Sequence, residues 1–214
     1  MTENGRGAVQ LRREKAALRA QIRRRASAMD PAEIVRSGRA VAESVLASSL
    51  WRKAGSVFLY INVGWEPDTR ILLIRALAEG KHVFVPKCLP GPERVMLAVR
   101  IRAAEELVPG AFGIPEPRQI PGCPAETAQA REFDLMLIPC VTADREGNRL
   151  GRGAGYYDRF LAPLGRDSRS SNHAQSNAFP AAVCLCHAAL LTDRVPAGPF
   201  DIRMDFVAAG DPLP

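Results

Sequence analysis

The sequence predicts a layered α/β domain with a largely parallel sheet, and two observations support this fold class. After about residue 50, short apolar runs alternate with amphipathic segments, as expected for a sheet covered by helices. The chain has 214 residues, 47% of them hydrophobic, which is enough for one well-filled domain or at most two small ones. We expect a single domain over residues 1–214, with disorder over residues 1–7 and a flexible polar loop over residues 165–180.

Six short apolar runs are expected to form the strands. The first, residues 57–61 (Val-Phe-Leu-Tyr-Ile), is continuously apolar and therefore predicts a buried strand. The expected strands are residues 57–61, 82–86, 95–101, 133–139, 181–186 and 206–209.

The expected helices carry recognisable start and stop signals. Leu11, Leu18 and Ile22 recur at helical spacing near the N-terminus. Asp30 followed by a proline predicts the start of the second helix, and Gly80 predicts the end of the third. The expected helices are residues 8–28, 31–49, 69–79 and 156–161.

The composition argues against several classes of protein. No apolar run approaches the roughly 20 residues that a membrane span requires, and the N-terminus lacks the apolar stretch of a secretory signal. Five cysteines without a Cys-x-x-Cys pair fit a reducing compartment better than a disulfide framework, and three scattered histidines show no metal-ligand spacing. We therefore expect a soluble cytoplasmic protein.

The net charge of +6 is concentrated near the N-terminus. Residues 1–53 carry 12 Lys and Arg against 5 Asp and Glu, whereas the rest of the chain carries 17 against 18. Three interpretations stay open: a solvated helix face, attraction of a small polyanionic ligand, and contact with RNA.

The most informative motif is the glycine-rich, arginine-flanked stretch 149–159 (Arg-Leu-Gly-Arg-Gly-Ala-Gly-Tyr-Tyr-Asp-Arg). Glycines let backbone N–H groups approach a ligand, and Arg149 and Arg152 add charge suited to phosphate oxygens. The spacing is neither that of a Walker A loop nor Gly-x-Gly-x-x-Gly, so a different nucleotide fold is implied. The alternative is a strand-to-helix turn with incidental arginines.

Other segments supply candidate ligand-binding side chains. Lys15 lies on the apolar stripe of the first helix with Arg19 one turn further on, where either a ligand or simple snorkelling explains the charge. Glu66 follows the first strand and is free to touch a ligand. Phe112 lies in a rigid turn, and core packing and stacking on a planar ligand are equally good interpretations.

These elements, in this order, resemble the 5-formyltetrahydrofolate cyclo-ligase family, also called 5,10-methenyltetrahydrofolate synthetases. The matching segments are Lys15-Ala-Ala-Leu-Arg19, Glu66–Thr69, Gly113–Pro117 and the unbroken signature Asp144–Arg159. The resemblance covers roughly residues 11 to 209, and the last motif is highly specific. It implies a three-layer α/β/α fold like that of ribose-5-phosphate isomerase and the CoA transferases.

The resemblance also implies an activity and a set of site residues. The activity would be ATP-dependent conversion of 5-formyltetrahydrofolate to 5,10-methenyltetrahydrofolate with Mg²⁺, by phosphorylation of the formyl oxygen. Lys15 and Arg152 would be catalytic, and Asp158 and Asp201 would hold the metal. The residues matched to ATP binding are Lys15, Ala16, Ala17, Leu18, Arg19, Arg149, Leu150, Gly151, Arg152, Gly153, Ala154, Gly155, Tyr156 and Tyr157. Those matched to the folate are Leu59, Glu66, Phe112, Arg152, Gly153, Ala154, Gly155 and Tyr156.

The chain departs from the family pattern at three positions. Cys140 replaces a glycine, Ala143 a phenylalanine, and Phe200 the histidine that usually precedes the C-terminal aspartate. The last change weakens the metal assignment of Asp201. We expect a monomer that binds a reduced folate and ATP, without membrane or nucleic-acid partners. The alternatives are a paralogue that binds RNA or regulates without ligase activity, and a ligase acting on another acyl-amine substrate.

Overall fold

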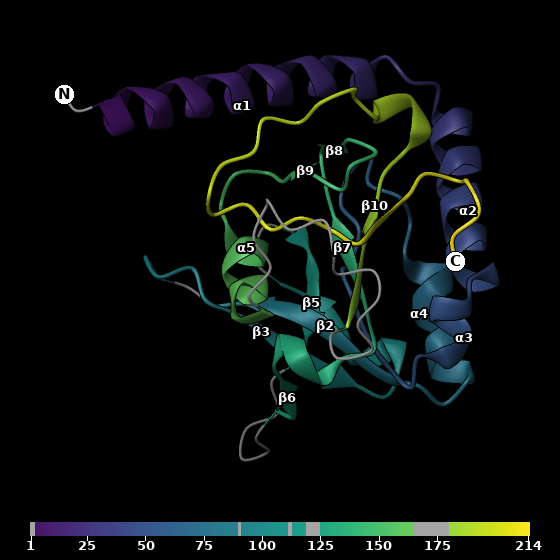
Figure 1. Cartoon of the computed structure of the whole chain (residues 1–214). Coiled ribbons are helices and arrows are strands. Elements are labelled where there is room, and N and C mark those ends of the chain that lie inside the picture. Colours follow the sequence, from purple (N-terminus) through teal and green to yellow (C-terminus); the bar gives the residue numbers. More distant parts are fainter. Residues whose placement is uncertain (1–2, 90, 111–112, 119–124, 165–179) are drawn as a thin grey trace.

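The computed structural model describes residues 3–89, 91–110, 113–118, 125–164 and 180–214 (Figure 1). Its α-helices are α1 (Glu3–Ser27), α2 (Pro31–Ala47), α3 (Ser49–Lys53), α4 (Arg70–Ala78) and α5 (Tyr156–Leu161). Its strands are β1 (Ser56–Leu59), β2 (His82–Cys88), β3 (Met96–Ile101), β4 (Leu107–Pro109), β5 (Pro115–Pro117), β6 (Thr127–Ala128), β7 (Leu135–Pro139), β8 (Thr142–Ala143), β9 (Arg149–Leu150), β10 (Ala181–Leu185) and β11 (Phe206–Ala208).

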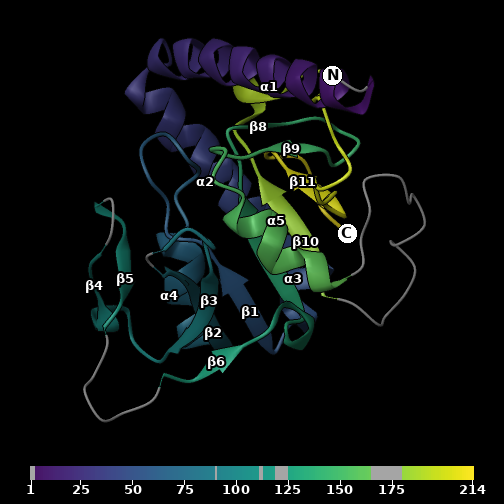
Figure 2. The ribbon, with the colours of Figure 1, turned by 90° about the vertical axis from the view of Figure 1, so that its left-hand side faces the viewer.

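The fold is built around a seven-stranded sheet with the order β11-β10-β7-β1-β2-β3-β6. The strands from β11 to β2 are parallel, whereas β3 and β6 each run antiparallel to the preceding neighbour. Helices α2, α3 and α4 cover one face and α5 covers the other (Figures 1 and 2). The predicted α/β fold class with a mostly parallel sheet is therefore confirmed.

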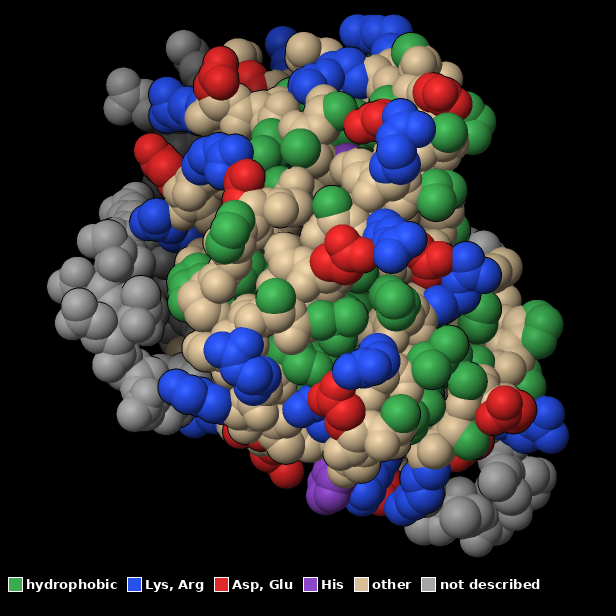
Figure 3. Space-filling view, turned by 90° about the vertical axis from the view of Figure 1, so that its right-hand side faces the viewer, with side chains coloured by type: hydrophobic (Ala, Val, Ile, Leu, Met, Phe, Trp, Pro, Cys, Tyr) green, Lys and Arg blue, Asp and Glu red, His purple; other side chains and the backbone are tan. Residues whose placement is uncertain are grey.

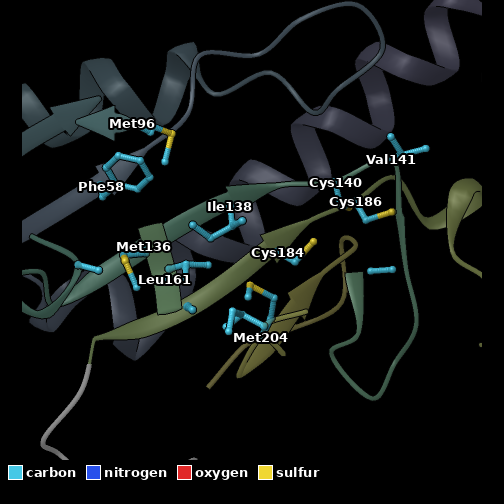
Figure 4. Packing of buried hydrophobic residues seen from close by; sticks show 14 of the residues in the cluster. Phe58, Met96, Met136, Ile138, Cys140, Val141, Leu161, Cys184, Cys186 and Met204 are labelled. Atoms are coloured by element: carbon cyan, nitrogen blue, oxygen red, sulfur yellow. The ribbon is translucent and has the colours of Figure 1, made fainter. Parts of the chain in front are cut away.

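The core divides into two apolar layers, because alternate residues of each strand point to opposite faces of the sheet. In β1, Val57 and Leu59 pack with Leu72 on the side of α2 and α4. Phe58 points to the other side, where it packs with Leu161 of α5 (Figure 4). Helix α1 joins this second layer through its C-terminal half and lies across the carboxyl edge of the sheet (Figure 1).

Two of the predicted helix boundaries are formed by the expected interactions. The Asp30 side chain accepts a hydrogen bond of 3.0 Å from the Ala32 N–H and caps α2. Gly80 ends α4 with a φ of +71°, and its N–H donates to the Leu77 carbonyl in a Schellman motif. Within the described ranges, no helix combines the length and apolar character that a membrane span requires.

The structure differs from the expected boundaries in several places. α1 begins at Glu3, so residues 3–7 are helical where disorder was predicted, because each added residue extends the hydrogen-bond ladder of the helix. α2 ends at Ala47, and the Ser48 hydroxyl then caps α3. The predicted flexible loop lies outside the described residues, except for Pro180.

Five short strands were not predicted. β4 pairs with β5 and β8 with β9, and β6 lies at the edge of the main sheet. Each has two or three residues, too few for an alternating pattern to be recognised in the sequence. β5 also contains part of the predicted rigid turn around residues 112–117.

The close contact between Gly147, in the turn between β8 and β9, and the backbone of Met204 can be tested by substitution. It has a φ of +90°, and an added Cβ would collide with the Met204 carbonyl oxygen. We expect Gly147→Ala to lower the free energy of unfolding by about 3 kcal/mol in urea denaturation, from backbone strain plus the collision. Gly80→Ala is the control: its φ is also positive but its Cβ would meet open space, so it should cost only about 1 kcal/mol. Equal losses would mean that the collision is absent.

Candidate active site

A cavity of about 1150 Å³ opens at the carboxyl edge of the sheet, beneath α1. Its walls come from α1, the loop after β1, the end of β2, the glycine loop with α5, and the segment 199–202. The predicted site residues that line it are Lys15, Arg19, Glu66, all of residues 149–158, and Asp201. Its volume lies slightly above the range of about 300–1000 Å³ that is typical of a pocket for one drug-sized ligand.

The glycine loop connects β9 to α5 and packs against α1. Gly153 and Gly155 have φ values of +102° and +77°, a conformation that residues with a side chain rarely adopt. The Arg19 Nε donates a hydrogen bond of 2.8 Å to the Gly151 carbonyl, and a Cβ at Gly153 would lie 3.3 Å from the Arg19 guanidinium carbon. The absence of side chains here therefore lets Arg19 lie directly against the loop.

Lys15 points into the cavity and has a partner there. Its Nζ lies 2.5 Å from Oδ1 of Asp201, and the two side chains are 15% and 25% exposed. Asp201 also accepts a hydrogen bond from the Gly198 N–H. The position of Lys15 on the apolar stripe is thus explained by an ion pair inside the site, not by snorkelling to solvent.

Arg149 is the most deeply buried cation of the site, with a side chain that is 3% exposed. Its Nη2 donates a hydrogen bond of 2.7 Å to Oδ1 of Asp158, and its guanidinium lies 6.0 Å from the Tyr157 ring centre. Within the described part of the chain, Arg149 Nε is the one buried side-chain polar atom without a hydrogen-bond partner. A buried N–H of this kind is suited to an incoming anionic acceptor.

Glu66 is held between the loop after β1 and the glycine loop. Its carboxylate accepts hydrogen bonds of 2.9 Å from Arg152 Nε and 2.8 Å from the Val63 N–H. The Glu66 side chain is 6% exposed, whereas that of Arg152 is 53% exposed. Burial raises the pKa of Glu66, and the charge and hydrogen bonds of Arg152 only partly oppose this.

Neutral phenols and a thiol supply further polar groups of the cavity wall. Burial raises the pKa of Tyr60 and of Tyr157 well above the usual value, and hydrogen bonding to Cys184 and Cys186 does the same for Cys140. These groups therefore stay protonated near neutral pH. A thiolate nucleophile at Cys140 does not fit this site, because nucleophilic attack needs the ionised form.

Two carboxylates are available for a metal ion. Asp158 and Asp201 both line the cavity, and the Ile202 N–H, in the peptide that follows Asp201, lies 3.4 Å from Oδ1 of Asp158. Among the described residues no group of three or more His, Cys, Asp or Glu side chains could hold a metal. Two carboxylates fit Mg²⁺ bound together with substrate phosphates, because that ion commonly uses one or two carboxylates in such sites.

Some predicted site residues do not line the cavity. Leu59 is fully buried in the layer beneath α2 and α4 and does not line the cavity, so its contact with the folate stays a prediction. Ala16 and Ala17 lie exposed on α1, and Leu18 packs against the core. Phe112 lies outside the described residues.

The chain matches a known family over almost its whole length. Residues 11–210 match the model of the 5-formyltetrahydrofolate cyclo-ligase family. The chain belongs to this family. A 5-formyltetrahydrofolate cyclo-ligase of Mycolicibacterium smegmatis is 36% identical over 177 residues, which cover 82% of this chain and 84% of that one.

Other members of the cyclo-ligase family agree in sequence and fold. A mouse 5-formyltetrahydrofolate cyclo-ligase is 25% identical over 95% of this chain and 97% of its own. The solved structure of Aquifex aeolicus 5,10-methenyltetrahydrofolate synthetase superposes with a TM-score of 0.73 and 26% identity, covering 92% of this chain and 89% of that one. A Mycoplasma pneumoniae synthetase shares the fold, with a TM-score of 0.66 and 18% identity.

Several cavity-lining residues were missed by the sequence analysis. Arg12 lies about one helical turn before Lys15, and Tyr60 directly follows the carboxyl end of β1, so helical spacing and strand-end position were available signals. Cys88, at the carboxyl end of β2, and Glu116, within the matched segment Gly113–Pro117, also line the cavity.

Phe200, which stands where the resemblance leads us to expect a histidine, lines the cavity and is 87% exposed. Because the Phe200 ring is exposed, we expect the change to affect the rim of the cavity. A phenylalanine cannot reproduce the ring nitrogens of the usual histidine.

The pairing of Arg152 with buried Glu66 predicts a pH-dependent loss of stability in Arg152→Gln. Without the guanidinium the pKa of Glu66 rises further above its ordinary value of 4.5. The folded state then keeps its proton while the unfolded chain releases it, so stability falls as pH rises. The variant should match the wild type near pH 4 in urea denaturation and be less stable by about 1–2 kcal/mol near pH 7.

Arg36→Gln is the matched control for this measurement. Arg36 and its partner Glu33 are 65% and 46% exposed, so breaking their ion pair should cost less than about 0.5 kcal/mol at either pH. A loss in Arg152→Gln that does not grow with pH would contradict the description of Glu66 as a buried carboxylate held by Arg152.

Proposed function

We propose that this chain catalyses the ATP-dependent conversion of 5-formyltetrahydrofolate to 5,10-methenyltetrahydrofolate. The observation that carries the proposal is a large cavity in which α1 and the glycine loop bring cations together, with the buried carboxylate of Glu66 bonded to Arg152 of that loop. Membership of the cyclo-ligase family supports this reaction.

The nucleotide phosphates would lie between α1 and the glycine loop. Lys15, Arg19, Arg149 and Arg152 all line this part of the cavity, and positive charge there stabilises a phosphoryl group in transfer. Three of these cations are held by carboxylates in the absence of ligand. Phosphate oxygens would replace those carboxylates, and Arg149 Nε would gain the acceptor that it lacks.

The folate would occupy the part of the cavity beside Glu66 and Tyr60. The formyl oxygen attacks the γ-phosphorus of ATP, and ADP leaves. The neighbouring folate nitrogen then attacks the activated carbon and loses its proton, and the C–O bond breaks as phosphate leaves. Arg152, which touches Glu66 from the glycine loop, lies where the folate and phosphate parts of the cavity meet.

Asp158 and Asp201 would hold Mg²⁺ beside the phosphates. The bound ion would neutralise part of the phosphate charge during transfer. Both carboxylates are paired with cations in the described structure. On binding, the metal would take the carboxylates and the nucleotide phosphates would take the cations, so both ligands would break the same ion pairs. We place the enzyme in the cytoplasm, where the four described cysteines would remain free thiols.

A nucleic-acid-binding role is less well supported. Lys15 and Arg19 turn into the cavity, where they cannot form part of an outer basic surface. On the face that carries α2 and α4, basic side chains are interspersed with acidic ones (Figure 3). Such a mixture does not form the continuous basic surface that binds a phosphate backbone.

Lys15→Ala tests the proposed function together with Arg13→Ala as its control. Lys15→Ala should lower turnover at least about 100-fold, because it removes a cation placed for the transferring phosphoryl group. Arg13 is exposed on α1 and does not line the cavity, so its variant should keep wild-type turnover. Turnover is followed by absorbance of the methenyl product with ADP release, and folding by thermal unfolding.

Three outcomes would contradict the proposal. Near-normal turnover in Lys15→Ala would contradict the assignment of Lys15 to the phosphate site. A wild-type protein without turnover that binds RNA tightly and with strong salt dependence would favour the paralogue without ligase activity. Turnover only with other formylated amines in a substrate panel would point to a ligase of different specificity.

A further inference from the structure

A buried histidine lies directly behind the cavity wall. His187 follows the carboxyl end of β10 by two residues and is 1% exposed. Its Nε2 lies 2.7 Å from the Trp65 carbonyl oxygen, and its Nδ1 lies 3.0 Å from the Ser37 hydroxyl of α2. The ring therefore links three segments that are distant in the sequence.

The hydrogen bonds assign one tautomer to this ring. The Trp65 carbonyl can only accept, so Nε2 carries the proton and donates it. Nδ1 of the neutral ring then accepts from the Ser37 hydroxyl. Burial lowers the pKa of His187, which keeps the ring neutral near pH 7.

Trp65 immediately precedes Glu66 in the loop between β1 and α4. On the Glu66 side, this loop is fixed by the bonds from Val63 and Arg152. On the far side, the Tyr60 hydroxyl donates 2.9 Å to the Pro67 carbonyl. His187 binds the carbonyl of Trp65, in the peptide bond between Trp65 and Glu66, and so connects this loop to α2 and to the end of β10.

We propose that His187 is a positioning residue for the folate part of the site. It holds the Trp65 carbonyl and thereby fixes the direction in which Glu66 enters the cavity. The ring does not line the cavity, so it acts through Glu66 without touching a ligand. This inference rests on the proposed function, in which Glu66 contacts the folate.

The test uses two amide substitutions that differ in where they place an N–H. His187→Gln puts an amide N–H near the position of Nε2 and can keep the bond to Trp65, whereas His187→Asn reaches only the Nδ1 position. Equilibrium binding of 5-formyltetrahydrofolate and of ADP with Mg²⁺ is measured for each full-length variant. His187→Asn should bind the folate about tenfold more weakly with ADP binding unchanged, and His187→Gln should stay within about threefold for both.

A double-mutant cycle separates positioning from a general loss of structure. If His187 acts through Glu66, adding His187→Asn to Glu66→Gln should weaken folate binding no further. Additive losses, equal weakening of both ligands, or unchanged folate binding in His187→Asn would each overturn the inference.

Ser37→Ala provides a second variant that leaves the imidazole in place. Loss of the hydroxyl frees Nδ1, so folate binding should weaken by about two- to threefold with ADP binding unchanged. If the His187 variants do not fold, unchanged folate binding in Ser37→Ala overturns the inference. A wild-type protein that does not bind the folate would overturn the proposed function and this inference with it.

Discussion

The site depends on one constraint: α1 has to be held across the carboxyl edge of the sheet. This helix carries eight Lys and Arg against two Glu, so its charge alone favours solvent. Ile22 and Ala26, which are 0% and 3% exposed, anchor its C-terminal half in the core. Lys15 and Arg19 then tie it to segments 186 and 132 residues away in the sequence. The cavity exists because these contacts bring α1 over the glycine loop.

Charge compensation explains the arrangement inside this cavity. A buried cation without a partner is costly. Lys15 and Arg152 pair with carboxylates from distant segments, and Arg149 pairs with Asp158 of its own stretch. The pairs keep the site stable before any ligand arrives. They also place the carboxylates Asp158 and Asp201 beside the cations, where a metal and a phosphate would be needed together. Arg149 is paired with Asp158, but its Nε has no hydrogen-bond acceptor, so one polar group of the site is left unsatisfied.

The sequence predicted the local features well, because each depends on neighbouring residues. Asp30 and Gly80 act as the expected helix signals, and the main strands lie near their expected positions. Contacts between distant segments could not be predicted: nothing in the sequence couples Lys15 to Asp201 or His187 to Trp65. Leu59 shows a different limit. Because side chains alternate along β1, Leu59 lies on the same face as Val57, and tertiary packing determines that this is the face covered by α2 and α4.

The central claim is that α1 and the glycine loop form one phosphate site within a cavity shared with the folate. A crystal structure with ADP, Mg²⁺ and 5-formyltetrahydrofolate tests it most directly. The account predicts the ADP phosphates between Lys15 and the loop 151–155, the metal beside Asp158 and Asp201, and the pterin ring next to Glu66. A nucleotide bound elsewhere, or a folate outside the cavity, would contradict it.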